Sequence, residues 1–208
     1  MPTPFLALMP LLMIIKGIPS PTEWKNTPVR SEAHGDTLTI AAGKSTDWYI
    51  SPVDQKPAAT APILLFTPAH DFVLVAKVSV DFKTQWDAGA LYIYIDDNTW
   101  AKFALEMAVY KKPTIVTVVT HGVSDDCNSW SVDGNWVWLK VARLGDAFGF
   151  YASRDGRTWE MIRAFTFGAG RSVRAGFSAQ SPIGPGAEAT FTNITYSERK
   201  VTDIFTGE

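Results

Sequence analysis

The chain has 208 residues, of which 46% are hydrophobic and 19% charged, an ordinary composition for a globular domain. Its formal net charge of −2 at pH 7 argues against the basic surface that nucleic-acid binding requires. Cys127 is the only cysteine, which excludes a disulfide within the chain and a metal site made of cysteines alone.

Residues 1–23 read as an apolar arm followed by a proline-rich connector. The run from Phe5 to Ile15 is almost continuously apolar, but a bilayer span takes about 20 residues, so we expect no membrane span. The first four residues carry no positive charge, and no Ala-x-Ala cleavage site follows. We therefore expect an arm that packs on the domain or joins two chains in a homo-oligomer. The corresponding location is cytoplasmic; the alternative is secretion, if residues 1–20 act as a signal peptide.

From Trp24 onwards, short runs of alternating apolar and polar residues are separated by turn residues, which is typical of β-strands. Two stretches, 52–70 and 121–135, are rich in proline or polar residues and are expected to be loops. We predict a β-sandwich domain over 24–197 and a C-terminal tail at 198–208. The predicted strands are 37–40, 46–51, 72–82, two within 86–107, 114–120, 136–144, 146–153, 157–165, 173–180 and 187–196.

The alternation is clearest in residues 86–107, which read as two strands joined by the turn Asp96-Asp97-Asn98. Successive side chains of a strand point to opposite faces of the sheet. One face is therefore aliphatic and belongs in the core, with Leu91, Ile93, Ile95, Phe103 and Leu105. The opposite face carries Tyr92, Tyr94, Lys102 and Glu106, and it is the best functional lead in the sequence.

Several short segments, taken in chain order, resemble one known family. These segments are Gly35–Thr39, Asp87–Gly89, Trp100–Lys102, Glu106, Val118–Asp125, Trp138–Arg143, Ser153–Gly156 and Gly176–Gln180. They look like the domain-of-unknown-function family that includes the fungal regulation-of-enolase protein, within the concanavalin A-like lectin/glucanase superfamily. The resemblance runs from about Trp24 to Tyr196. It implies an all-β, concanavalin A-like jelly-roll sandwich of two curved antiparallel sheets, and in the wider superfamily the concave face holds sugars. It implies no settled activity.

We predict a non-catalytic binding module that holds a carbohydrate or a similar small polar ligand on the concave sheet face, with no cofactor and no metal. Aromatic rings stack on sugar rings, and fixed polar groups bind the hydroxyls. Aligned strands would bring the candidate residues to one face, with His121 at its rim. The candidates are Tyr92, Tyr94, Lys102, Glu106, Thr117, His121, Trp138, Lys140 and Gln180.

Two other functions stay open. A glycan hydrolase needs two carboxylates about 5–9.5 Å apart, whereas Glu106 stands alone on its strand and only Asp81 is expected to approach it. A protein-interaction or regulatory domain is the second alternative, which the fungal relative suggests. In the simplest structural interpretation, Glu106 is a cross-strand partner for Lys102 or Lys140 on a solvated face.

Overall fold

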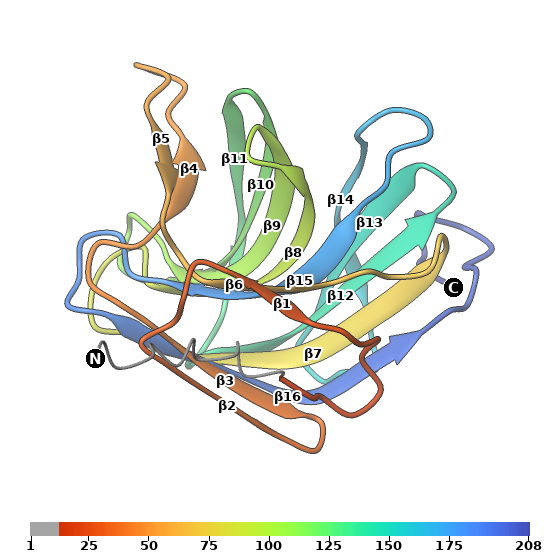
Figure 1. Ribbon diagram of the computed structural model, residues 1–208, viewed down its shortest axis with the longest axis horizontal. Helices are drawn as coiled ribbons and strands as arrows, with labels where there is room; N and C mark the ends of the chain where they lie inside the picture. The colour runs from red at the N-terminus through yellow and green to blue at the C-terminus, as the bar shows by residue number, and fades with distance from the viewer. Residues whose placement is uncertain (1–12) are drawn as a thin grey trace, which may run out of the picture.

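A computed structural model describes residues 13–208, and these residues form an all-β sandwich of two seven-stranded antiparallel sheets (Figure 1). The front sheet has the order β1 (Glu23–Lys25), β6 (Ile63–Phe66), β15 (Arg174–Gln180), β8 (Ala88–Asp96), β9 (Thr99–Met107), β10 (Pro113–His121) and β11 (Ser124–Ser131). The back sheet has the order β14 (Glu160–Thr166), β13 (Ala147–Ser153), β12 (Trp136–Leu144), β7 (Phe72–Asp81), β16 (Ala187–Ser197), β3 (Thr37–Ala42) and β2 (Arg30–His34). The predicted fold class is confirmed.

A separate hairpin of β4 (Trp48–Ile50) and β5 (Pro57–Ala59) belongs to neither sheet. It stands over the outer face of the front sheet, and strands β8–β11 curl upward beside it (Figure 1). This outer face is therefore the concave face of the molecule. The described residues include no long apolar helix of the kind that crosses a bilayer.

The main core fills the space between the two sheets. The expected aliphatic face of β8 and β9 lies there, and the ring of Phe103 stacks on Phe150 with centroids 4.8 Å apart. The sheets approach so closely at Gly89 that a Cβ atom there would lie 2.7 Å from the Cβ of Ala189. Only glycine fits this position without a shift of the back sheet.

Both segments expected to be loops contain strands, so the loop prediction is wrong there. Residues 52–70 include β5 and β6, and residues 121–135 include β11. All four residues of β6 are buried, so its sequence is a continuous apolar run without alternation. The opposite holds for β11, an edge strand that is mostly exposed and therefore almost entirely polar. Neither strand carries the period-two pattern on which the prediction relied.

The described end of the predicted arm packs on its own chain. Met13 and Ile15 are buried in the main core, and the Lys16 amide donates a hydrogen bond to the Gly35 carbonyl. The rest of the arm, residues 1–12, lies outside the described residues, so the homo-oligomer through it stays a prediction. At the other end, Val201 is fully buried against the outer face of the back sheet.

Candidate functional site

A pocket of about 360 Å³ opens on the concave face of the front sheet, between the β4–β5 hairpin and the loops that follow the neighbouring strands. We call it the hairpin pocket. Its lining combines carboxylates, one lysine, an amide and aromatic rings from five separate parts of the chain. The lining residues are Asp47, Tyr49, Trp86, Lys102, Glu106, Val109, Asp126, Gln180 and Pro182.

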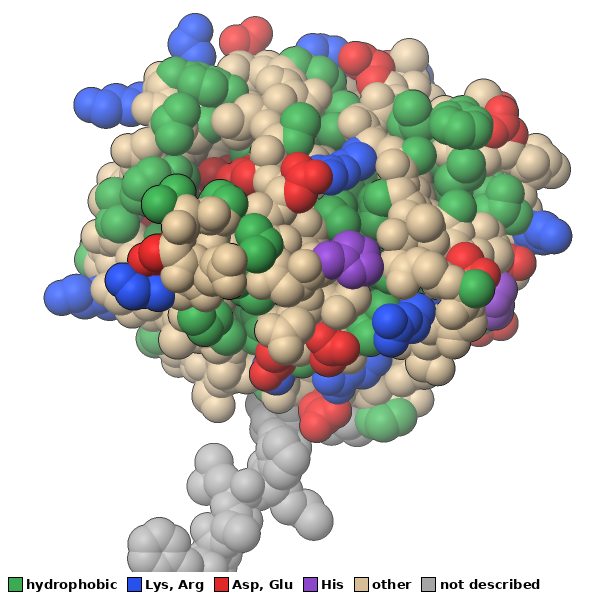
Figure 2. Space-filling model, turned by 90° about the horizontal axis from the view of Figure 1, so that it is seen from above, with side chains coloured by type: hydrophobic (Ala, Val, Ile, Leu, Met, Phe, Trp, Pro, Cys, Tyr) green, Lys and Arg blue, Asp and Glu red, His purple; other side chains and the backbone are tan. Residues whose placement is uncertain are grey.

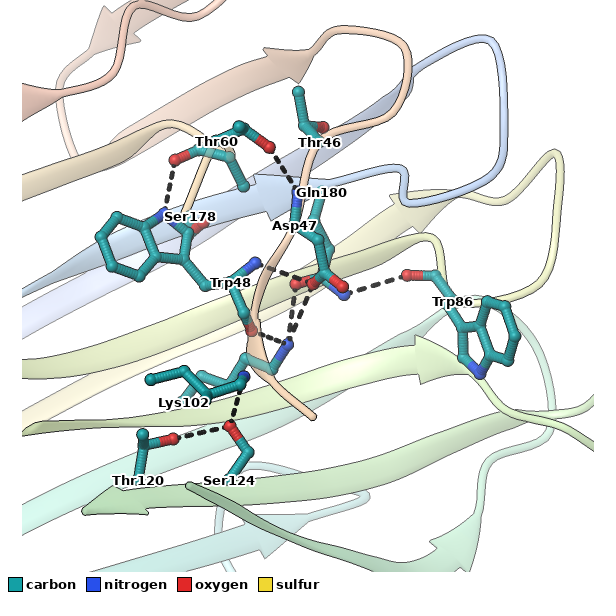
Figure 3. A network of polar contacts seen from close by, with 12 residues as sticks. Thr46, Asp47, Trp48, Thr60, Trp86, Lys102, Thr120, Ser124, Ser178 and Gln180 are labelled. Atoms are coloured by element: carbon teal, nitrogen blue, oxygen red, sulfur yellow. Dashed lines mark hydrogen bonds and ion pairs between the residues drawn. The ribbon is translucent and has the colours of Figure 1, made fainter. Parts of the chain in front are cut away.

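The hairpin is a fixed wall because Trp48 anchors it to the sheet. The indole is fully buried, meets Tyr94 and Trp100 edge to face with centroids 6.0 Å apart in each pair, and donates to the Ala61 carbonyl at 2.8 Å. The backbone amide of Ile50 also donates to the Ser124 hydroxyl at 2.9 Å. These contacts fix the hairpin over the front sheet, and Figure 3 shows the hydrogen bonds among them.

Lys102 organises the floor of the pocket. Its Nζ donates to the Trp48 carbonyl at 2.9 Å and to Gln180 Oε1 at 3.0 Å, and it lies 3.5 Å from Asp47 Oδ1 (Figure 3). An ammonium group has three donors, so these partners use all of them. Gln180 in turn donates from Nε2 to the Trp86 carbonyl at 3.2 Å. Lys102 therefore holds the pocket together and has no donor left for a ligand.

Trp86 stands at the rim in a conformation that a bulky residue seldom adopts. Its φ is +68°, and its side chain is 37% exposed. Its amide donates to the Met107 carbonyl at 2.7 Å, and the next residue, Asp87, is buried and bonds the amides of Lys83 and Thr84. Strained residues held in this way are concentrated at binding and active sites. Trp86 thus presents an exposed aromatic ring beside the pocket, on a backbone that hydrogen bonds hold in place.

Glu106 is the buried acid of the site. Its side chain is 6% exposed, it lines the pocket, and its carboxyl forms no hydrogen bond with any described residue. Burial raises the pKa of Glu106 to about 8; the positive charge of Lys102 opposes the shift, and the carboxylates of Asp126 and Asp47 add to it. The carboxyl is therefore largely protonated at neutral pH.

Asp126 and Asp47 complete a group of three acids around one lysine. Burial also raises the pKa of Asp126, although this residue is exposed on the edge strand β11 and water screens its charge more than that of Glu106. Asp47 lies beside Lys102, with its side chain 22% exposed. Among residues 13–208, no three acidic, histidine or cysteine side chains are arranged to hold a metal ion.

Five of the nine predicted site residues share the concave face, and three of them line the pocket. These three are Lys102, Glu106 and Gln180. Tyr92 and Tyr94 belong to the same face but are buried beneath Trp48, so they cannot serve as an open stacking platform. Glu106 is also buried, which corrects the interpretation of it as part of a solvated face.

The expectation that Thr117 and His121 share the concave face is wrong, because both point toward the back sheet. Side chains alternate along β10, and these two share a face with Ile115 and Val119 of the main core. The hydroxyl of Thr117 accepts a bond of 3.3 Å from Arg163, and the ring of His121 lies 5.2 Å from that of Phe167.

Trp138 and Lys140 are also misplaced by the prediction. Both lie in β12 of the back sheet, on the outer face of the sandwich, where the Lys140 Nζ is 4.6 Å from the ring centroid of Trp159. Asp81, the acid expected to approach Glu106, ends β7 of the same sheet. Alternation shows which residues of a strand share a face, but it does not show to which sheet the strand belongs.

The other six lining residues were not among the predicted site residues: Asp47, Tyr49, Trp86, Val109, Asp126 and Pro182. Strand pairing carried the missing information for Asp126, because Lys102 pairs with Val118 in β10 and Val118 pairs with Asp126 in β11. Recognition of β11 as a strand would have placed Asp126 in line with Lys102. No periodic pattern marks Trp86, which lies in a turn before β8.

The face seen from above, which includes the hairpin side of the molecule, carries acidic, basic and apolar side chains interspersed (Figure 2). Its described part shows no extended basic patch. Charge at the hairpin pocket is therefore set locally, by its three acids and Lys102, and not by a field over the whole face.

Comparisons with known proteins agree with this architecture. The chain is 23% identical over 174 residues to Regulation of enolase protein 1 of Saccharomyces cerevisiae, covering 81% of this chain and 85% of that protein. The crystal structure of a functionally unknown protein from Saccharomyces cerevisiae superimposes with a TM-score of 0.80 at 20% identity, covering 86% of this chain and 97% of that one. The carbohydrate-binding module CBM66 of Bacillus subtilis gives a TM-score of 0.52 at 14% identity over 88% of this chain and 98% of that one.

The structural similarities concern the fold alone. They support the concanavalin A-like sandwich expected from the sequence. Membership of a family follows from a match over most of the chain. Residues 24–199 match the family described as protein of unknown function (DUF1349), so the chain belongs to that family.

Proposed function

We propose that this protein is a binding module that holds a saccharide, or a polyol of similar chemistry, in the hairpin pocket. The observation that carries the proposal is the pocket itself: an exposed indole at the rim, and acidic and amide groups around a floor that Lys102 holds together. Sugar recognition combines these two features, an aromatic face and preorganised hydrogen-bonding groups. The similarity to a carbohydrate-binding module supports the proposal at the level of the fold.

The pocket is preorganised before any ligand arrives. Lys102, Gln180 and the backbone of Trp86 are connected by hydrogen bonds, and the hairpin wall is anchored by Trp48. A ligand therefore meets groups that need little reordering, which reduces the entropy lost on binding.

Binding to a panel of immobilised glycans, followed by titration of each hit, tests the proposal. Trp86→Ala should weaken binding about tenfold or more, which corresponds to about 1.4 kcal/mol. Trp136→Ala is the matched control, because that indole is also 37% exposed but lies on the back sheet. Equal losses in the two variants, or no glycan bound by the wild type, would contradict the proposal.

A glycan hydrolase is the second candidate, and the high pKa of Glu106 favours it. A carboxyl that stays protonated at neutral pH is suited to act as a general acid, and Asp47 or Asp126 would supply the second carboxylate. In that case Glu106→Gln should abolish the release of reducing ends from a hydrolysed glycan while binding survives. A wild-type protein that binds glycans without releasing reducing ends supports the non-catalytic module instead.

A regulatory or protein-interaction role is supported only by the name of the yeast relative, at 23% identity. Affinity capture from a lysate, compared between wild type and Trp86→Ala, would connect such a role to the hairpin pocket. A partner retained equally by both proteins would place it elsewhere on the molecule.

A further inference from the structure

We propose that the hairpin pocket selects a saccharide that carries a protonated amino group, and that Glu106 pairs with this ammonium. The inference rests on the proposed saccharide site and names the class of sugar that the site prefers. In the lining of this pocket, three acids surround a single cation.

The single cation is already satisfied within the protein. Lys102 Nζ binds the Trp48 carbonyl and Gln180 Oε1 and lies next to Asp47, so its charge and its donors are directed toward the hairpin wall. The remaining acids, Glu106 and Asp126, have no cation at ion-pair distance among the described residues of the lining. The pocket therefore offers no cation of its own to Glu106 or Asp126.

Glu106 is the buried acid of the pocket that has no partner within the described protein. It is more than nine-tenths buried, it lines the pocket, and none of the described residues forms a hydrogen bond with its carboxyl. A buried carboxyl with no protein partner, open only to the cavity, has its oxygens available to a ligand that enters the pocket. The titratable groups around it are Lys102 of β9, Asp126 of β11, Asp47 at the start of the hairpin, Tyr49 of β4 and the buried Tyr92 of β8.

The partner is better matched by an ammonium group than by a metal ion. No three metal-ligating side chains within residues 13–208 converge on one point, so a bare ion would lack ligands. An amino group on a sugar brings its own covalent frame, which the other polar groups can hold. The aromatic rings of Tyr49 and Trp86 in the lining also attract cations.

Proton release gives this pairing a signature that simple packing lacks. Burial holds the pKa of Glu106 near 8, so at pH 6 the free protein keeps a proton on this carboxyl. An ammonium that pairs with Glu106 stabilises its ionised form, and the carboxyl then releases its proton to the buffer. A neutral sugar produces no such release.

The experiment compares three tetrasaccharides that differ at one substituent: glucosamine tetramer, N-acetylglucosamine tetramer and cellotetraose, which carry an amino, an acetamido or a hydroxyl group at C2. Titration calorimetry at pH 6, in two buffers of different ionisation enthalpy, measures affinity and proton release together. We expect the glucosamine tetramer to bind about tenfold more tightly than the other two, equivalent to about 1.4 kcal/mol. We expect it alone to release a proton.

Glu106→Gln should remove both the preference and the proton release, and Asp126→Asn should reduce the preference. Asp81→Asn, an exposed acid of the back sheet, is the control for general attraction of a cation and should change neither. Equal affinity for the three sugars overturns this inference and leaves the saccharide site standing. A preference that survives Glu106→Gln also overturns it. Binding of none of the three overturns it as well, and the glycan panel then decides whether the saccharide site stands.

Discussion

At the scale of single residues, Glu106 links stability to pH. Its pKa rises from an ordinary 4.5 to about 8 on folding, so between these values the folded protein binds the proton more tightly than the unfolded chain. Its contribution to stability is complete below about pH 4.5 and is lost as the pH rises through 8. Glu106→Gln has no such dependence. We expect the variant to melt higher than wild type at pH 9, by more than any difference seen at pH 5.

Thermal unfolding followed by circular dichroism at the two pH values measures this difference. Asp81→Asn, which removes an exposed carboxyl from the back sheet, should give a curve parallel to that of the wild type. If the melting temperatures of wild type and Glu106→Gln changed in parallel with pH, the carboxyl of Glu106 would ionise in the folded protein as it does in the unfolded chain.

Phe103 tests the assignment of faces on β9. Its ring is fully buried and stacks on Phe150, so Phe103→Ala should lower the free energy of unfolding by about 3–5 kcal/mol, measured by chemical denaturation. Tyr110→Ala, which removes a ring that is 47% exposed, is the comparison and should have a much smaller effect. A loss below about 1 kcal/mol for Phe103→Ala would contradict the packing described for the main core.

At the scale of elements, the sequence analysis predicted the strands that have one buried and one exposed face. It missed strands whose two faces are both buried or both exposed. The alternation in 136–144 predicted β12 to the residue. The apolar run of β6 and the polar run of β11 have no period, and each was assigned to a loop. The pairing of β11 with β10 supplies its stability instead, through hydrogen bonds that local sequence does not reveal.

The hairpin is the element that makes the pocket, and Trp48 is its anchor. Trp48→Ala should let the hairpin open locally, because few other buried side chains hold it to the front sheet. We expect faster hydrogen exchange in residues 46–61 and unchanged protection in β8 and β9. Val53→Ala, at the exposed hairpin tip, is the control. Protection lost evenly across the front sheet would show that Trp48 supports the whole sheet instead.

At the scale of the whole molecule, the site is assembled by topology. Lys102 and Gln180 are 78 residues apart and yet hydrogen bonded, and Asp47 reaches them from a hairpin outside both sheets. The sequence predicted the sandwich, and it predicted one face of the central hairpin. It could not predict that β12 belongs to the opposite sheet, because that assignment depends on the strand order of the complete fold. This is why Lys102, Glu106 and Gln180 were placed correctly while Trp138 and Lys140 were not.

The N-terminal segment gives a test of how far the folded unit extends. The family match begins at residue 24, whereas Met13 and Ile15 are buried in the main core. Deleting residues 1–20 should therefore leave a folded β-sandwich of lower stability, because each lost apolar side chain contributes about 1.5–3 kcal/mol of burial. Circular dichroism should retain its β spectrum, and chemical denaturation should show the reduced free energy of unfolding. Ile15→Ala in the full chain is the matched variant and should lose part of the same stability.

Size-exclusion chromatography of the truncated protein and of Ile15→Ala, each compared with the wild type, distinguishes packing of the arm within a chain from assembly between chains. If the arm joins two chains, the truncated protein elutes as a smaller species, while Ile15→Ala keeps the size of the wild type. An unchanged number of chains per particle removes the predicted homo-oligomer. A truncated protein that does not fold would show that residues 13–20, which contact the core through Met13 and Ile15 and the Gly35 turn through Lys16, are indispensable to the sandwich.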